Sequence, residues 1–216
     1  MMPRPASPSS DIDALHQPGA RPTPLSDQML AQLRREFPRF RLQAKSESRL
    51  SAAIDLGLRL VTLGRQNRYL TEYHTVIGET LFVAPTWQLM SDESRLVLLR
   101  HERVHLQQRR RLGSVWMAIL YLLPFAPLGL AWGRARLEWE AYVETLRATA
   151  ELFGVDRLAD PELKRSLVER FTGPDYGWMW PFPRAVGRWY DRAVQAIEHQ
   201  MREPRARRRG ESQLES

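Results

Sequence analysis

The feature that most constrains this chain is a run of residues without charge, 112–133, which has an arginine on either side. A run of this length is sufficient to span a bilayer as a helix. Pro124 and Pro127 lie inside it, however, and proline disrupts a helix interior. We therefore expect two short apolar arms that fold back as a helical hairpin, with a kink at Gly113-Ser114. The segments on either side of the run would then lie together as antiparallel helices.

Hydrophobic periodicity elsewhere predicts an α+β fold that is mostly helical. A first helix begins near Ser26, a candidate N-cap, and ends before Pro38. Further helices are expected over about 47–62, over 92–112 after a cap at Ser91, and over about 184–201.

A change of period between these helices predicts a small antiparallel sheet. Polar and apolar residues alternate over 69–77, Gly78-Glu79 forms a turn, and the strand TLFVA follows at 80–84. This order is typical of a β-hairpin with a glycine-first turn. We expect the hairpin to lie directly before the helix over 92–112.

The two ends of the chain differ in composition from the middle. Residues 1–24 are rich in proline and serine, and residues 202–216 are rich in arginine, so both are expected to be disordered. A single domain is expected over 25–201. The first residues lack the apolar segment of a secretory signal peptide, which predicts a cytoplasmic protein.

The strongest chemical signal is the sequence HERVH, in which His101, Glu102 and His105 form an HExxH motif on the helix over 92–112. Two histidines four residues apart on a helix lie one turn above each other and can bind one metal ion. The glutamate between them then leans toward the open coordination position. The alternative is an ordinary helix with two surface histidines.

A catalytic zinc site needs a third protein ligand. Cysteine is absent, and Arg111 stands where the extended motif would have a third histidine. What remains is an acidic residue on a later helix, and the segment LEWEAYVETLRA supplies three candidates, Glu138, Glu140 and Glu144.

With the segment Glu138-Trp139-Glu140-Ala141-Tyr142 after it, HERVHLQQ resembles the gluzincin class of zinc metallopeptidases over roughly residues 69–152. It is most similar to compact gluzincins and to the CaaX-type and heat-shock-type membrane proteases. It is also similar to metallopeptidase-like domains associated with bacterial contractile injection systems. The second helix of the membrane proteases reads Glu, two residues, Ala and Asp. Aligned on Ala141, this pattern implies that Glu138 binds zinc.

The resemblance implies a zinc-dependent hydrolysis of peptide bonds with Glu102 as general base. Tyr142 stands where those proteases have an aspartate that orients a histidine, so Glu140 is the candidate to replace that aspartate. In related enzymes substrate pairs with the edge of the strand before the zinc helix, a role expected here for the strand around Phe82. Candidates for stabilising the oxyanion are Tyr142, Tyr176 and His199.

The position of the metal motif limits the topology of the apolar run. A single crossing would place His105 and Glu138 on opposite sides of a membrane, which favours the hairpin. Two readings of 112–133 stay open: packing on the core of the protein, or peripheral or re-entrant insertion of the hairpin tip into a membrane.

The net charge of +7 is concentrated near the metal motif, because residues 95–111 contain six arginines and one glutamate. This position favours an anionic membrane surface as a partner and disfavours nucleic acid, for which no binding motif is present. We therefore expect either an active peptidase acting on a protein or peptide, or an inactive relative that binds a membrane or a partner.

Overall fold

The computed structural model of the chain describes residues 23–45, 74–122, 131–173 and 179–214. Within these ranges the protein is a mostly helical α+β fold, with six α-helices and a three-stranded sheet. The α-helices and strands are, in chain order, α1 (Leu25–Glu36), β1 (Arg41–Ala44), β2 (Thr75–Ile77), β3 (Thr80–Val83), α3 (Asp92–Leu112), α4 (Ser114–Leu122), α5 (Trp132–Phe153), α6 (Pro161–Thr172) and α7 (Pro183–Leu214). Two short 3₁₀ helices, Pro85–Leu89 and Val155–Ala159, precede α3 and α6.

The sheet is mixed, and β3 is its central strand. β2 pairs with β3 antiparallel, which confirms the predicted hairpin next to its turn, where Gly78 has a φ of 68°. Residues 69–73 of the expected first strand lie outside the described residues. A Cβ at Gly78 would lie 2.8 Å from Nη1 of Arg109 on α3, so glycine allows the turn to approach that helix. β1 pairs with β3 in parallel. Four residues, RLQA, are too short to show a clear period, which is why β1 was not predicted.

The expected role of Phe82 in pairing with substrate does not fit this strand order. Phe82 lies opposite Gln43 of β1 and Thr75 of β2, so both edges of β3 already carry main-chain partners. The Phe82 side chain is buried. The local sequence identified the strand correctly, but it carried no information about β1, which occupies the second edge.

The start of α1 is capped from a distance. Pro24 is the N-cap residue, and Ser26 lies buried in the first turn instead of capping the helix. The carboxylate of Asp92, in the first turn of α3, accepts hydrogen bonds from the backbone N–H groups of Leu25 (2.7 Å) and Ser26 (3.0 Å) and from the Ser26 hydroxyl (2.5 Å). These bonds hold the pKa of Asp92 below its usual value, and they join α1 to α3.

The helix over 92–112 forms as predicted. Oγ of Ser91 accepts a hydrogen bond from the backbone N–H of Ser94 at 3.2 Å. The helix ends at Gly113, whose φ of 80° interrupts the helical path before α4 begins at Ser114. The predicted kink is therefore a complete break between two helices. Pro124, Pro127 and the hairpin tip lie outside the described residues, as does the helix expected over 47–62. Among the described helices, none is both long and apolar enough to cross a membrane.

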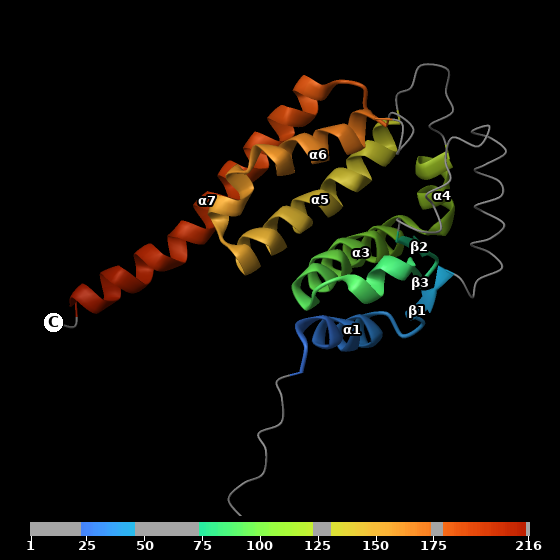
Figure 1. Cartoon of the computed structure of the whole chain (residues 1–216), viewed down its shortest axis with the longest axis horizontal. Coiled ribbons are helices and arrows are strands. Elements are labelled where there is room, and N and C mark those ends of the chain that lie inside the picture. Colours follow the sequence, from blue (N-terminus) through green and yellow to red (C-terminus); the bar gives the residue numbers. More distant parts are fainter. Residues whose placement is uncertain (1–22, 46–73, 123–130, 174–178, 215–216) are drawn as a thin grey trace, which may run out of the picture.

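α3 and α5 pack side by side in opposite directions (Figure 1). Arg100 near the middle of α3 contacts Glu144 of α5, whereas Arg111 at the end of α3 contacts Glu140, closer to the start of α5. Residue numbers thus rise along one helix as they fall along the other, and the predicted antiparallel arrangement is confirmed.

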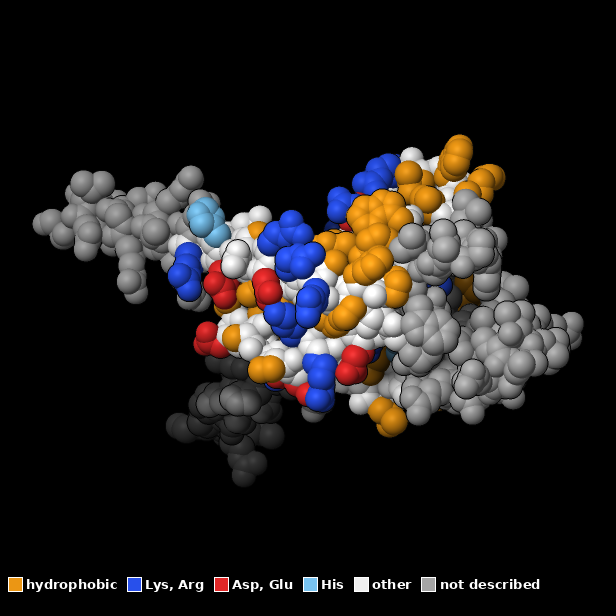
Figure 2. All heavy atoms as spheres, turned by 90° about the horizontal axis from the view of Figure 1, so that it is seen from above, with side chains coloured by type: hydrophobic (Ala, Val, Ile, Leu, Met, Phe, Trp, Pro, Cys, Tyr) orange, Lys and Arg blue, Asp and Glu red, His pale blue; other side chains and the backbone are white. Residues whose placement is uncertain are grey.

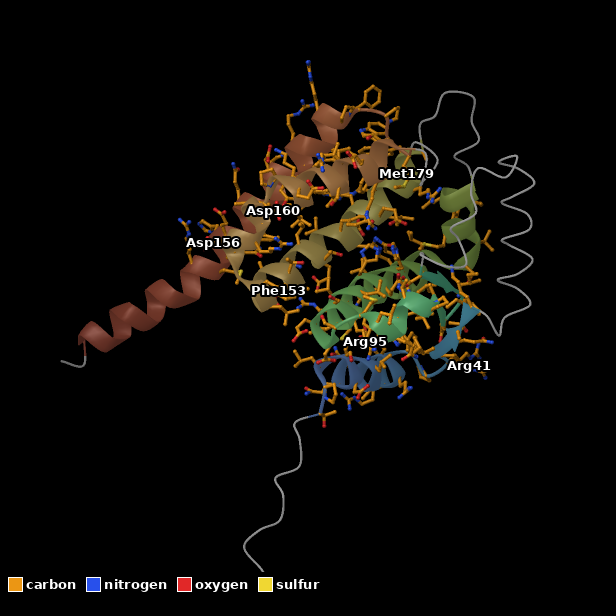
Figure 3. The ribbon with its side chains drawn as sticks, in the orientation of Figure 1. Arg41, Arg95, Phe153, Asp156, Asp160 and Met179 are labelled. Carbon is orange, nitrogen blue, oxygen red and sulfur yellow. The ribbon has the colours of Figure 1, made fainter. Side chains whose placement is uncertain are left out.

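Two hydrophobic cores flank this helix pair. The first is formed by α1, the sheet and the face of α3 that carries Leu99 and Leu106. The second is formed by α5, α6 and α7 and includes Phe171 and Met179. Figure 3 labels Met179 at the end of the molecule where α5 begins, and Phe153 at the opposite end of that helix. The polar interface between α3 and α5 therefore lies between two apolar cores.

The last helix is longer than the sequence suggested. α7 was expected over about 184–201, and it continues to Leu214, through the arginine-rich segment expected to be disordered. Core packing nucleates this helix up to Ile197, and alanine, arginine and glutamate in the extension have good helix propensity. Pro204 lies within the extension, and its presence is not explained by propensity.

Candidate metal centre

Three side chains from α3 and α5 converge in the interface between the two helices. His101 and His105 extend from successive turns of α3, and Glu138 faces them from α5. The Nε2 atoms of the histidines lie 3.1 Å apart. Oε2 of Glu138 is 3.9 Å from Nε2 of His101 and 3.8 Å from Nε2 of His105. His105 and Glu138 are buried, and together the three residues form a group that could hold a metal ion.

These distances match the dimensions of a tetrahedral site. Ligand atoms about 2.0–2.1 Å from a zinc ion at tetrahedral angles lie about 3.3 Å from one another. The three distances between ligand atoms, 3.1, 3.8 and 3.9 Å, lie close to that value. One central ion can therefore contact all three atoms after shifts of a few tenths of an ångström.

The tautomer of His101 is assigned by its neighbour Thr145 on α5. Nδ1 of His101 lies 3.0 Å from Oγ1 of Thr145, and the hydroxyl of Thr145 donates its one hydrogen to the carbonyl of Ala141. Thr145 must then accept, so Nδ1 of His101 carries the hydrogen. Nε2 of His101 is consequently the unprotonated nitrogen, which is the form that binds a metal.

The tautomer of His105 is assigned by Gln108, one turn further along α3. The Gln108 amide nitrogen donates to the carbonyl of Leu137 at 2.9 Å and to the carboxylate of Glu140 at 3.0 Å. These two bonds orient the amide so that its oxygen faces Nδ1 of His105 at 3.0 Å. Nδ1 of His105 therefore donates, and its Nε2 is the unprotonated nitrogen.

Both histidines thus direct the lone pair of Nε2 toward the same point, beside the Glu138 carboxylate. With these tautomers the contact of 3.1 Å between the Nε2 atoms has no hydrogen to share. Two nitrogen lone pairs and a carboxylate that converge in this way are suited to bind a cation. Burial also lowers the pKa of His101 to about 3, with a smaller contribution from His105, so His101 is neutral at pH 7.

Glu102 is positioned by the same turn of α3 and is buried. Burial raises the pKa of its carboxyl to about 7, because a charged carboxylate is poorly solvated there. The field of His105 lowers this pKa and the field of Glu138 raises it, which shows that Glu102 is electrostatically coupled to the candidate ligands. A carboxyl with a pKa near neutral pH can both accept and return a proton.

Tyr142 stands where the similar proteases have an aspartate that orients a histidine, and its contacts differ from those of such an aspartate. The ring of Tyr142 packs edge-on against His101, with centroids 4.9 Å apart, and its hydroxyl accepts a hydrogen bond from Arg170 of α6 at 3.3 Å. The field of Arg170 also lowers the pKa of His101, so its guanidinium lies within electrostatic range of the site. Thr145, rather than an aspartate, holds the His101 ring.

The two other glutamates of α5 have separate partners. Glu140 contacts Gln108, Arg111 and Arg136, so it supports His105 indirectly through the amide of Gln108. Glu144 contacts Arg100 and Arg147. Of the three acidic candidates, the structure brings only Glu138 into the group with the two histidines.

Among the described residues, the other two histidines, His74 and His199, are not part of this group. Tyr176 lies outside the described residues, and His199 is exposed on α7. His74 lies beside the sheet, where Nδ1 accepts a hydrogen bond from the backbone N–H of Ala84 at 3.3 Å. Burial lowers the pKa of His74 to about 4.

Four residues near the site carry roles that the sequence reasoning missed. Thr145, Gln108 and Arg170 act through contacts between helices, and a contact partner leaves no periodic signal in a sequence. The fourth, Lys45, directly follows β1 and is buried, and its charge lowers the pKa of both Glu102 and His74. Of the four, only Gln108 stands in a motif quoted from the sequence, as the last residue of HERVHLQQ.

Comparison with protein-family models, with curated proteins and with solved structures finds no match to this chain. The function must therefore be argued from the geometry of the His101, His105 and Glu138 group.

Proposed function

We propose that the protein is a zinc-dependent metallopeptidase of gluzincin type, with His101, His105 and Glu138 as metal ligands. The observation that supports this proposal most directly is the convergence of two unprotonated Nε2 atoms and a buried carboxylate on one point. Two histidines and one carboxylate are a common ligand set of catalytic zinc, which keeps a further position for water. Thr145 and Gln108 fit this assignment because metal-binding histidines donate their second N–H to a fixed acceptor.

When bound, a zinc ion lowers the pKa of a coordinated water and polarises a substrate carbonyl. Glu102 is the residue we assign to the proton transfer: its carboxylate accepts a proton from water and delivers that proton to the leaving amine. Tyr142 and the guanidinium of Arg170, which hydrogen-bonds to it, are the candidates for stabilising negative charge that develops on the substrate oxygen.

The substrate class we propose is a protein or peptide. The sheet lies beside the zinc helix as in the resembling enzymes, and β2 contacts α3 directly. Because β3 has both edges paired, an extended substrate would have to pair with an outer strand of the sheet.

The alternative function is an inactive relative that keeps the metal site and serves as a membrane-binding or partner-binding module. It is favoured by the exposed apolar residues Val115 and Trp116 on α4, which a peptidase site does not require. This alternative predicts zinc binding without turnover.

The proposal is tested by measuring zinc content and proteolysis on the same purified variants. We expect one zinc per unmutated chain, and loss of zinc in His105→Ala and Glu138→Gln but not in His199→Ala, which changes an exposed histidine of α7. Glu102→Gln should retain zinc and lose about 10²- to 10⁴-fold in hydrolysis of an unstructured protein such as casein. Absence of stoichiometric zinc in the unmutated protein would refute the metal assignment. Hydrolysis unchanged in Glu102→Gln would refute the assigned base.

A further inference from the structure

A groove with an unusual lining lies on the face of α5 that points away from the metal centre. It has a volume of about 320 Å³ and lies between α5 and α7. Trp132, Trp139 and Trp189 form its aromatic wall. The guanidinium groups of Arg136, Arg147 and Arg192 complete the lining, and none of the described lining residues is acidic. The groove therefore combines aromatic surface with positive charge.

The charge around this groove is not balanced by its neighbours. Arg136 shares Glu140 with Arg111, and Arg147 shares Glu144 with Arg100. Each of these carboxylates thus contacts an arginine of α3 as well, although Arg100 of that helix also contacts Glu151. The described lining of the groove itself has three arginines and no acidic residue. Viewed from above, basic side chains, with some acidic ones among them, lie beside a group of hydrophobic side chains (Figure 2). Charge complementarity favours an anionic partner.

Large apolar side chains surround the end of the molecule where this groove opens. Trp132 at the start of α5 is 52% exposed, and Phe182, just before α7, is 49% exposed. Trp180 joins them, with its ring 5.0 Å from Trp132 and 5.1 Å from Phe182. These side chains form a continuous apolar surface next to the arginines.

α4 packs beside this surface, against the start of α5. Leu120 of α4 packs so closely on Gly133 of α5 that a Cβ there would lie 2.5 Å from Cδ2 of Leu120. α4 is thereby held against the start of α5, and its residues Val115 and Trp116 are 72% and 63% exposed. A soluble partner of any class can neutralise arginines, but exposed tryptophans beside arginines are the side chains that occupy the headgroup region of a bilayer.

We propose that the end of the molecule formed by α4 and the starts of α5 and α7 docks on an anionic lipid bilayer, and that the tryptophan and arginine groove receives an acidic headgroup. Val115, Trp116, Trp132 and Phe182 enter the interfacial layer, and Arg136 and Arg192 contact lipid phosphate. Glu138 is about 9 Å along the α5 axis from Trp132, at 1.5 Å per residue. Docking therefore holds the metal centre close to the bilayer surface, which goes beyond the proposed peptidase activity.

The test uses the full-length protein and vesicles of phosphatidylcholine alone or mixed with phosphatidylglycerol. We expect flotation with the anionic vesicles, weaker binding to the neutral ones, and a loss of binding as salt is raised. Arg136→Gln and Arg192→Gln should each reduce the partition constant about fivefold. Trp116→Ser and Trp132→Ser should each reduce it roughly 5- to 30-fold, according to the apolar surface each withdraws from the bilayer.

The chain provides matched controls at other positions. Phe153, at the opposite end of α5, is 51% exposed, so Phe153→Ser should leave binding unchanged (Figure 3). The Arg157 side chain is 58% exposed, compared with 60% for Arg136, and each of the two contacts one carboxylate. Arg157 does not line the groove, so Arg157→Gln should also bind vesicles normally. Trp132 contacts other aromatic rings, whereas Trp116 lies on the surface of α4; Trp116→Ser therefore reports on docking even where Trp132→Ser impairs folding.

The proposal is overturned if the unmutated protein does not float with anionic vesicles, or if the control variants lose as much binding as the groove variants. Tighter binding to an oligonucleotide or to polyglutamate than to vesicles, with Trp116→Ser unaffected, would also overturn it in favour of another anionic partner. His105→Ala should lose zinc and keep lipid binding, so the two proposals fail independently.

Discussion

Replacing Gln108 by leucine tests the inferred tautomer of His105 directly. In the unmutated protein the Gln108 side chain accepts from Nδ1 of His105 and is itself held by Leu137 and Glu140. Leucine is similar in size but offers no acceptor. His105 then keeps its place on α3, but nothing fixes its ring orientation or the nitrogen that carries the hydrogen.

The expected loss follows from these three hydrogen bonds. Removal of the partner that orients a metal-binding histidine typically lowers metal affinity about 10- to 100-fold, which is about 1.4 to 2.8 kcal/mol. The fold itself should lose about 1–3 kcal/mol, because a buried donor at His105 and a buried carbonyl at Leu137 lose their partner. The two effects are measured separately, as zinc affinity and as the free energy of unfolding without zinc.

The assay is competition for zinc with a fluorescent chelator at neutral pH, and chemical unfolding of the metal-free protein. Gln107→Leu is the matched control, because Gln107 is the neighbouring residue, is exposed, and contacts only Glu36 of α1 among the bonds described. The control should bind zinc as the unmutated protein does. Unchanged zinc affinity in Gln108→Leu would refute the argument that Gln108 sets the tautomer of His105.

Three further results are expected. Thr145→Val should lower zinc affinity about tenfold, because it removes the acceptor for Nδ1 of His101. Thr149→Val removes a similar hydroxyl one turn later and should leave zinc affinity unchanged. Equal effects of the two variants in the chelator assay would count against the role of Thr145. As the pH falls from 6.5 to about 4, the unfolded chain gains a proton on His74 that the folded chain excludes, so the free energy of unfolding should fall. His74→Gln should remove this part of the pH dependence, measured by urea titration at several pH values. A pH dependence that is unchanged in His74→Gln would contradict the prediction. Asp92→Asn should destabilise the protein at pH 7 by about 0.5–1 kcal/mol, because it weakens the cap of α1. Since the pKa of Asp92 is lowered in the folded protein, the difference in unfolding free energy between this variant and the unmutated protein should shrink at acid pH below that pKa. A difference that stays constant with pH would refute the role of Asp92 as a cap.

The elements that the sequence predicted correctly are those determined by neighbouring residues. Ser91, the apolar face with Leu99 and Leu106, and Gly113 define the start, face and end of α3 within one segment. The β2 and β3 hairpin is likewise specified by alternation around Gly78. HExxH could be placed on a helix for the same reason, since its spacing and its helical period are both local.

The features that were missed depend on chain segments far apart in the sequence. Asp92 caps α1 across 66 residues, and β1 joins the sheet by pairing with a strand far along the chain. His101 meets Thr145 only because α3 and α5 pack in one register out of several that the periodicity allows. Glu138 was selected from three glutamates by resemblance, and it is the packing of α3 on α5 that brings it to the histidines.

The position of the candidate metal centre gives it a structural role as well as a chemical one. α3 belongs to the core with α1 and the sheet, and α5 belongs to the core with α6 and α7, so the packing of α3 on α5 joins the two. That interface contains two imidazole nitrogens 3.1 Å apart and a carboxylate within 4 Å of each, so both helices contribute atoms to the candidate site. An ion bound to all three atoms would join α3 to α5. Metal affinity and the attachment of one core to the other are therefore expected to be parts of a single equilibrium, in which each strengthens the other.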